Sequence, residues 1–465
     1  MKIESSILKT SKILLPIRCK TTPYNITWLR EGPLLSSRVY KLKVMFWLIE
    51  TNSQLKELSN KGYTKAFVEV IPNSYVEHPC LNGVCAVYIR PLDAAKGFII
   101  PISHSETLSI SIDNVNDILN EFNSVYVRDK KEFLHYFLLK NTFDITLHSP
   151  TYIRELTQCH HFFHKQYPTK KDVSKIIPIV KHYELCEDTF NELKPNINEE
   201  QNNFYNTKAP MVFNALERSG IRVDKQEFES HFHDIDGEYA YTQFNFKTLT
   251  GRPSNRFKGV NYAAINKDNG DRKSFIPRND TLLELDISAY HPTLLSHLLG
   301  YEFGSNDIHM AFAKMYGVEY AKAKELTFKQ MYGGVFDQYK DLEFFKKMQV
   351  YTDDLWARFQ NEGSIECPVS KHIFKKEELH DMKPQKLLNY VLQNLETATN
   401  VRILWEIFKI LKGRNTKLVL YTYDSFLFDF DDSEREIIRE ILNVFKINKL
   451  QIKHSYGETY DFTES

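Results

Sequence analysis

The sequence Leu282-Leu-Glu-Leu-Asp-Ile-Ser288 decides the fold of the second half of the chain. Its residues alternate in polarity, so the polar side chains Glu284, Asp286 and Ser288 share one face of a β-strand, opposite the apolar side chains between them. Pro292 then prevents further strand pairing, and the apolar residues from Leu294 to Leu299 have helical spacing. The stretch therefore predicts a strand with an acidic face that leads directly into a helix.

A second carboxylate lies on a similar segment far downstream. Residues 418–429 read as two apolar strands, with Tyr423-Asp424-Ser425 at their junction. An aspartate in so apolar a setting costs free energy unless a cation meets it. Two such aspartates on neighbouring strands would repel each other unless divalent metal neutralised them. A pair of Mg²⁺ ions about 4 Å apart is the usual arrangement for nucleotidyl transfer.

The strands alone leave other interpretations open. Asp424 could simply serve a hairpin turn, and Asp286 the end of a strand. Paired carboxylates also catalyse glycoside hydrolysis, in which one acid protonates the leaving oxygen.

Between the two strands, the stretch from His309 to Tyr332 has helical periodicity. Lys324, Phe328 and Tyr332 follow one another at intervals of four, so they lie along one helix face, and Gly333 and Gly334 end the run. Such a face offers an ammonium group to phosphate oxygens and two rings to a base or sugar. An ordinary amphipathic helix would also carry these residues.

A basic segment precedes the first carboxylate strand. Residues 241–280 contain eight Lys or Arg against three Asp, a net charge of +5, with Phe257 and Tyr262 among them. Interleaved cations and rings suit a groove that follows a nucleic-acid backbone, although a solvated basic loop would have the same composition.

The composition limits the class of protein. The chain has 465 residues, 60 Lys plus Arg against 60 Asp plus Glu, 42% hydrophobic and 13% aromatic residues. This length predicts two or three domains with packed cores, and zero net charge argues against a general polycation. Apolar runs are too short for a membrane span, six Cys form no disulfide or zinc-finger pattern, and no secretory signal is visible. We therefore expect a cytoplasmic protein with reduced thiols and no membrane contact.

The first half is predicted to be a mixed α/β domain. Strands are expected at 65–71, 84–90 and 97–102, and helices at 115–139 and 174–193. The polar stretch 195–206 is expected to be a linker, followed by a helix over 209–218 that Gly220 stops. The whole chain is thus predicted as α/β (α+β), with a first domain over 1–195 and a second over 196–465.

In combination and in this order, the segments of the second half resemble the family A DNA polymerases, the bacterial DNA polymerase I type, in a small viral or phage-like form. The resemblance covers 209–430 and extends weakly into the first half. It rests on six segments: Thr250-Gly-Arg252 with Ser254, Asp286-Ile-Ser288, Asp307-Ile-His309, Lys324 with Phe328, Tyr332 and Gly333, Asn389 with Gln393, and Tyr423-Asp-Ser425.

The resemblance implies a polymerase right hand that adds deoxynucleotides to the 3′-hydroxyl of a primer on template DNA. Asp286 and Asp424 would hold two Mg²⁺ ions, or Mn²⁺ as a substitute, with the Ile287 carbonyl as a further ligand. One metal would lower the pKa of the 3′-hydroxyl, and the other would neutralise the triphosphate and leaving pyrophosphate. The implied nucleotide-binding residues are Lys324, Phe328, Tyr332, His291, Ser288 and Lys322, and the implied DNA-binding residues are Arg252, Ser254, Asn389, Gln393 and Tyr423.

Three positions depart from the family pattern. His291 stands where a glutamate usually excludes the ribose 2′-hydroxyl, and Tyr320 replaces an arginine for which Lys322 would substitute. Ser425 replaces a glutamate, as in single-subunit RNA polymerases, which makes RNA synthesis the alternative. A non-catalytic nucleic-acid-binding remnant is the third hypothesis, although Asp286, Asp424 and Lys324 together argue against it.

Two further expectations follow from the resemblance. Residues 225–249 are too few for a long helical thumb, so the thumb would be vestigial, processivity low, and an accessory replication protein a possible partner. The location would be cytoplasmic, or the host cytoplasm or nucleoid for a viral protein.

The first half resembles a ribonuclease-H-like 3′–5′ exonuclease domain through Phe67-Val-Glu-Val, 97–104 and Tyr183-Glu-Leu-Cys-Glu187. That activity needs four carboxylates around two metals. Phe67 stands where an aspartate is expected, and the acid positions read as Glu69, Glu132, His148 and Glu187, with Asp144 or Asp188 as replacements. We therefore expect an inactive, structural domain, with active proofreading as the alternative.

Overall fold

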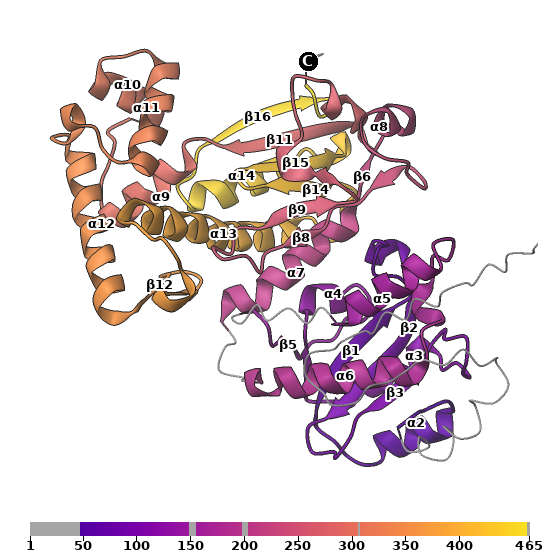
Figure 1. Cartoon of the computed structure of the whole chain (residues 1–465). Coiled ribbons are helices and arrows are strands. Elements are labelled where there is room, and N and C mark those ends of the chain that lie inside the picture. Colours follow the sequence, from indigo (N-terminus) through magenta and orange to yellow (C-terminus); the bar gives the residue numbers. More distant parts are fainter. Residues whose placement is uncertain (1–46, 148–154, 198–202, 306, 463–465) are drawn as a thin grey trace, which may run out of the picture. The chain divides into compact units, whose positions relative to one another are not determined.

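The computed structural model describes residues 47–147, 155–197, 203–305 and 307–462 (Figure 1). The chain divides into two compact units, Met1–Leu48 and Ile49–Ser465, and the description below concerns the second. It is a mixed α/β structure, as the sequence predicts, and its two larger sheets belong to different halves of the chain.

The first half is built on a five-stranded sheet of order β3-β2-β1-β4-β5. The first three strands are antiparallel neighbours, and β4 and β5 continue the sheet in parallel with β1. Its strands are β1 (Lys65–Pro72), β2 (Val84–Pro91), β3 (Phe98–Pro101), β4 (Ser124–Val127) and β5 (Thr142–Asp144). Its helices are α2 (Asn52–Ser59), α3 (Ile112–Glu121), α4 (Lys130–Phe133), α5 (Glu155–Gln166) and α6 (Ile179–Leu193), of which α6 packs against β1 and β2. Its assignment to the exonuclease class stays a prediction.

The helix expected over 115–139 is wrong. Helix α3 ends at Glu121, and Phe122 already has extended backbone angles. The four residues of β4 are all buried and pair in parallel with β1. A strand covered on both faces shows no alternation of polarity, so its apolar residues could be read at helical spacing.

The second half is built on a four-stranded antiparallel sheet of order β14-β15-β11-β16. Its strands are β11 (Thr281–Ile287), β14 (Lys417–Thr422), β15 (Ser425–Phe430) and β16 (Ile452–Gly457). The helices α7 (Phe204–Ser219), α13 (Pro384–Ile410) and α14 (Ile437–Ile447) pack together, and α7 also contacts β14. One large apolar cluster, including Phe213, Leu285, Leu404 and Phe428, fills the space between them.

A helical region lies between β11 and α13 in the sequence. It comprises α9 (Tyr290–Leu299), α10 (Ile308–Tyr316), α11 (Tyr320–Gly333) and α12 (Glu343–Glu362). The single helix expected over 309–332 is in fact two, because Gly317 adopts a left-handed conformation with φ of 66° and ends α10. Helices α10 and α11 then pack against each other.

The segments that remain are short. They are α8 (Lys225–His231), β6 (Ile221–Arg222), β7 (Tyr239–Ala240), β8 (Phe244–Asn245), β9 (Ser254–Phe257), β10 (Val260–Asn261), β12 (Ser364–Glu366) and β13 (Ile373–Lys375). Residues 225–249 thus contain one helix of seven residues. The expected linker over 195–206 ends where α7 begins, at Phe204, and 198–202 lie outside the described residues.

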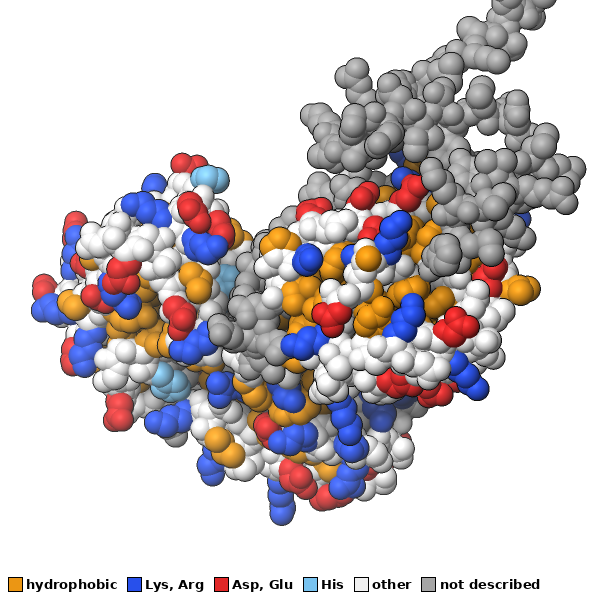
Figure 2. Space-filling model, turned by 90° about the horizontal axis from the view of Figure 1, so that it is seen from below, with side chains coloured by type: hydrophobic (Ala, Val, Ile, Leu, Met, Phe, Trp, Pro, Cys, Tyr) orange, Lys and Arg blue, Asp and Glu red, His pale blue; other side chains and the backbone are white. Residues whose placement is uncertain are grey.

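Acidic and basic side chains are interspersed on the face shown in Figure 2, with apolar side chains visible between them, as the zero net charge leads one to expect. Among the helices that the structure describes, none combines the length and the apolar character needed to cross a bilayer.

Buried ion pairs tie the first half to α7. Glu217, which is fully buried, accepts hydrogen bonds from Lys131 Nζ at 2.7 Å and from the backbone N–H of Phe244 at 2.6 Å. His135 Nε2 lies 2.8 Å from the second carboxylate oxygen. Burial alone would raise the pKa of Glu217, but Lys131 and His135 overcome that effect and lower it below its ordinary value.

We expect Glu217→Ala to lower the free energy of unfolding by about 3–5 kcal/mol, because it leaves the buried Lys131 ammonium without its partner. Urea denaturation measures this change. Since the pKa of Glu217 is lowered by folding, its contribution is complete above the unfolded pKa of about 4.3 and is lost as the pH falls through the lower folded value. Glu406→Ala, which removes the exposed pair with Lys409, is the control and should change stability by less than about 1 kcal/mol.

Candidate active site

The register of β11 and β15 brings two acidic residues together. Asp286 on β11 is paired with Ser425, the first residue of β15, and Asp424 immediately precedes that residue in the turn. The backbone N–H of Ile287 donates to the Asp424 carbonyl at 2.8 Å, which fixes the turn against the end of β11. The two aspartates, 138 positions apart in the sequence, thus lie at the ends of adjacent strands.

The two carboxyl groups differ in exposure, because Asp286 is half-buried and Asp424 is exposed. Burial raises the pKa of Asp286 to about 6, and the nearby carboxylates of Asp424 and Glu284 add to this effect. Lys267 and Lys324 oppose it. Partial desolvation also raises the pKa of Asp424, although its side chain still reaches solvent. Among the described residues neither aspartate forms an ion pair, so their charge is left for something else to neutralise.

A third carboxylate lies beside the pair. Glu284, two residues before Asp286 on β11, is buried and accepts a hydrogen bond from Ser425 Oγ at 2.6 Å. The hydroxyl of Tyr460 donates to the same oxygen at 3.2 Å. Ser425 stands where the family pattern has a glutamate, but its hydroxyl contacts Glu284 on the neighbouring strand. A third carboxylate is therefore still present beside the two aspartates.

The turn that carries Asp424 is strained and braced. Tyr423 has φ of 66°, a left-handed conformation that costs a non-glycine residue about 1–2 kcal/mol. Asn400 on α13 donates to the Tyr423 carbonyl at 2.7 Å, and the Arg252 guanidinium stacks on the Tyr423 ring at 3.7 Å from its centroid. These contacts from two other segments hold the backbone in a conformation that it would not keep alone.

A hydrogen-bonded chain connects α9, α11 and α13. His291 Nε2 lies 2.5 Å from Glu396 Oε2, and His291 Nδ1 lies 2.5 Å from the Tyr332 hydroxyl. A carboxylate can only accept, so Nε2 donates to Glu396, and Nδ1 can then accept from Tyr332. Arg252 Nε also contacts Glu396, at 3.3 Å. Residue Ala289, with φ of 50°, turns the chain sharply between β11 and α9 and so places His291 in this chain.

Glu396 was missed by the sequence analysis. It is buried on α13, and it contacts both Arg252 and His291. A signal was present, because Glu396 is the single acidic residue between Pro384 and Asn400. A lone carboxylate within a mostly buried helix requires a partner of opposite charge.

The predicted face of α11 is present. The rings of Phe328 and Tyr332 stack with their centroids 6.0 Å apart and an interplanar angle of 17°. Lys324 is exposed on the same helix and acts electrostatically on Asp286. Lys322 instead pairs with Glu325 at 2.9 Å, so its ammonium already has a partner.

The remaining predicted residues lie on three elements. Asn389 and Gln393 are adjacent on α13, where Gln393 donates to Asn389 at 3.3 Å. Ser288 directly follows β11 and donates its backbone N–H to Gln451. Ser254 begins β9 and lines a cavity of about 570 Å³ that it shares with residues of the first half, including Tyr75 and Arg128.

Most of the Lys and Arg side chains in the basic segment 241–280 already contact other groups of the protein. Arg278 pairs with buried Asp429 at 2.9 Å, and Arg272 stacks on Tyr460. Lys258 pairs with Glu77, and Arg252 with Glu396. The basic segment 241–280 is therefore largely held by contacts within the protein and is not a free basic loop. Its positive charges pair with acids and stack on rings from distant parts of the chain.

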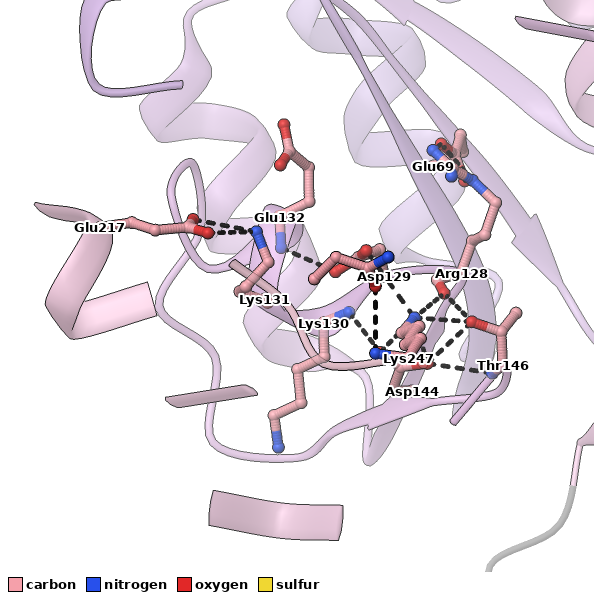
Figure 3. A network of polar contacts seen from close by, with 11 residues as sticks. Glu69, Arg128, Asp129, Lys130, Lys131, Glu132, Asp144, Thr146, Glu217 and Lys247 are labelled. Atoms are coloured by element: carbon pink, nitrogen blue, oxygen red, sulfur yellow. Dashed lines mark hydrogen bonds and ion pairs between the residues drawn. The ribbon is translucent and has the colours of Figure 1, made fainter. Parts of the chain in front are cut away.

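Lys247, from the same segment, enters the acidic cluster of the first half (Figure 3). Its ammonium lies 2.9 Å from Asp144 and 3.7 Å from Asp129, and it donates to the Thr146 hydroxyl at 2.6 Å. Nearby, Arg128 contacts both oxygens of Glu69, the shortest distance being 2.7 Å.

Two other acids predicted for an exonuclease site, Glu187 and Glu132, lie among the described residues. Glu187 accepts from the Tyr88 hydroxyl and the Gly97 N–H at 2.7 and 2.6 Å. Burial raises the pKa of Glu132. Phe67 is fully buried on β1, and His148 lies outside the described residues.

Comparison with solved structures shows a likeness to a polymerase structure. The chain is similar to the POL domain of Pol1 from M. smegmatis, solved in complex with DNA primer-template and dNTP, with a TM-score of 0.69. The fold is that of a polymerase domain. The match covers 90% of this chain and 100% of that one at 14% sequence identity, so the likeness shows the fold alone. No protein-family model and no curated protein matches the sequence.

We expect Asn400→Ala to destabilise the protein by at least about 2 kcal/mol. Asn400 accepts from the Tyr290 hydroxyl at 2.8 Å and donates to the Tyr421 hydroxyl and the Tyr423 carbonyl, so its loss leaves several buried polar groups unpaired. Chemical denaturation measures the change, with Asn120→Ala on the exposed face of α3 as the control. Equal stability of the two variants would show that Asn400 does not brace the turn.

Proposed function

We propose that this protein is a template-directed DNA polymerase, which adds deoxynucleotides to the 3′-hydroxyl of a primer. The observation that carries the proposal is the pair Asp286 and Asp424, which lie at adjacent strand ends of a polymerase fold without a neutralising cation. Glu69, Asp144, Glu217, Glu396 and Asp429 each form an ion pair, whereas buried Glu284 beside the two aspartates is held by the hydroxyls of Ser425 and Tyr460.

The donor set fits magnesium, with manganese as a substitute. Asp286, Asp424 and the carbonyl of Ile287 offer only oxygen ligands, which Mg²⁺ prefers, and Asp286 is neutralised by protonation near pH 6 unless a cation replaces the proton. Two bound ions would supply activation of the primer hydroxyl and neutralisation of the triphosphate charge. Glu284 would keep Ser425, and hence the turn, in position through their hydrogen bond.

The chain's own groups would bind the nucleotide from α11 and α9. Lys324 would contact the triphosphate as an exposed ammonium, and the stacked rings of Phe328 and Tyr332 would form a wall for the base and sugar. Ser288 follows the metal-binding strand and would line the same pocket. We assign Lys322 a lesser role, because its charge is paired with Glu325.

The DNA duplex would lie along α13 and the basic segment 241–280. Asn389 and Gln393 can donate to the minor-groove acceptors that all base pairs share, and so check pair geometry without reading sequence. Arg252 and Tyr423 stack on each other, and we propose that this pair contacts the duplex beside Asn389 and Gln393. Ser254 would contact the sugar–phosphate backbone of the DNA. The segment 225–249 would be a vestigial thumb with little grip on the duplex, so an accessory replication protein belongs to the proposal as a partner.

We further propose that the first half has no proofreading activity. The acids Glu69 and Asp144 are held by Arg128 and Lys247, so the positions that divalent metals would need are taken by cations of the chain itself. An ammonium cannot be displaced by Mg²⁺ without leaving a buried charge unpaired.

Primer extension tests the activity. Wild-type protein with Mg²⁺, a labelled primer–template and dNTPs should extend the primer, whereas Asp424→Asn should lower the rate at least about 1,000-fold because it removes one metal ligand. In parallel reactions without dNTPs the primer should keep its length. Asp432→Asn, an exposed acid outside the site, is the matched control. Extension by Asp424→Asn at the wild-type rate would contradict the proposal, and so would a wild-type protein that binds the primer–template without extending it.

Selection between deoxyribose and ribose would depend on the hydrogen-bonded series Tyr332–His291–Glu396. Because His291 is buried and held from both sides, its ring would be rigid enough to exclude a 2′-hydroxyl. The His291 and Ser425 positions also give the alternative its support, since an RNA polymerase of the single-subunit type would accept rNTPs at this site.

We expect His291→Ala to raise rNTP incorporation relative to dNTP by about tenfold or more, equivalent to about 1.4 kcal/mol. Glu396→Gln, which keeps the shape but weakens the hold on Nε2, should produce a smaller change in the same direction. Single-nucleotide incorporation rates give the ratio, and His297→Ala on the exposed part of α9 is the control. Wild-type protein that uses both sugars equally would favour the RNA polymerase alternative without contradicting nucleotidyl transfer.

A further inference from the structure

Three potential metal ligands meet inside the first half, away from both acidic clusters. Cys85 on β2, His104 just beyond β3 and His182 on α6 each offer one ligand atom, and these three atoms lie within 4.8 Å of one another. Their side chains are 0%, 4% and 2% exposed. Sulfur and imidazole nitrogen together form the donor set that zinc prefers.

Backbone carbonyls orient both imidazoles. His104 Nε2 lies 2.8 Å from the carbonyl of Ile177, and His182 Nε2 lies 2.9 Å from that of Ser174. A carbonyl can only accept, so each Nε2 carries the proton and each Nδ1 presents a lone pair. Metal-binding histidines are commonly held this way, with the second ring nitrogen donating to a carbonyl.

The cluster is not satisfied by the protein alone. His182 Nδ1 is buried and has no hydrogen-bond partner among the described residues, and the same is true of the Ser174 hydroxyl. Cys85 Sγ forms no described hydrogen bond. The Nδ1 of His104 accepts from the Glu106 N–H at 3.2 Å, which is at the long end of the hydrogen-bond range. Buried lone pairs without partners are costly, and a cation would remove that cost.

We propose that Cys85, His104 and His182 bind one structural Zn²⁺ ion, with a buried water as the fourth ligand. Zinc–sulfur and zinc–nitrogen distances of about 2.3 and 2.1 Å place tetrahedral ligands about 3.6 Å apart, so the side chains would close on the ion by about 1 Å. Binding converts the Cys85 thiol to a thiolate with release of one proton.

The ion would add a further link between elements that hydrogen bonds already connect, such as the bond from the Tyr88 hydroxyl on β2 to Glu187 on α6. It would fasten α6 to β2 and to the segment after β3, so zinc would stabilise the first half whether or not the protein polymerises nucleotides. The inference is thus independent of the proposed function.

Zinc content tests the site. Full-length protein equilibrated with Zn²⁺ and desalted should retain about one zinc per chain by mass spectrometry, and its thermal midpoint should fall when a strong chelator removes the ion. Cys85→Ser and His182→Gln should each weaken binding about 100-fold or more. Cys186→Ser and His309→Gln are the matched controls, because both residues are equally buried and lie outside the cluster.

Cobalt makes the test independent of variant folding. Wild-type protein loaded with Co²⁺ should show the visible bands of tetrahedral cobalt and a thiolate charge-transfer band in the near ultraviolet. Wild-type protein that retains no zinc, a cobalt spectrum without the thiolate band, or controls that lose zinc as fully as Cys85→Ser would each overturn the proposal.

Discussion

The pairing of β11 with β15 is the constraint on which the candidate site of the second half depends. The register of β11 against β15 forces the two carboxyl groups together, and burial raises the pKa of both. Several other buried acids among the described residues have a cation beside them, as Asp429 has Arg278. The absence of an ion pair at these two aspartates, within the part of the chain that the structure describes, is the reason why we propose that external cations bind there.

In the first half, by contrast, several of the clustered acids have ion-pair partners. There Lys247 pairs with Asp144 and Arg128 pairs with Glu69. Lys247 comes from the segment that follows α7, so the two halves share a charge network rather than a simple apolar contact. If the first half lacks proofreading activity, as we propose, these ion-paired acids stabilise its structure instead.

Much of the second half could be predicted from sequence because its signals are local. Strand β11 follows from alternation, β14 and β15 follow from two apolar runs on either side of Tyr423-Asp424, and the face of α11 follows from spacing by four. The partners of Arg252, Lys247 and Glu396 could not be predicted, because each lies more than 100 positions away and charge pairing has no sequence period. Strand β4 was missed for a related reason, since a fully buried strand shows no alternation.

Helix α13 runs unbroken for 27 residues, about 40 Å. Asn389 and Gln393 lie near its first turns, and Asn400, further along, grips the turn that carries Asp424. An α-helix without a kink behaves as a stiff lever, so a tilt imposed at one end reaches the other with no hinge to absorb it. If Asn389 contacts a duplex as we propose, a displacement at Asn389 would reach the turn that carries Asp424 through the same helix.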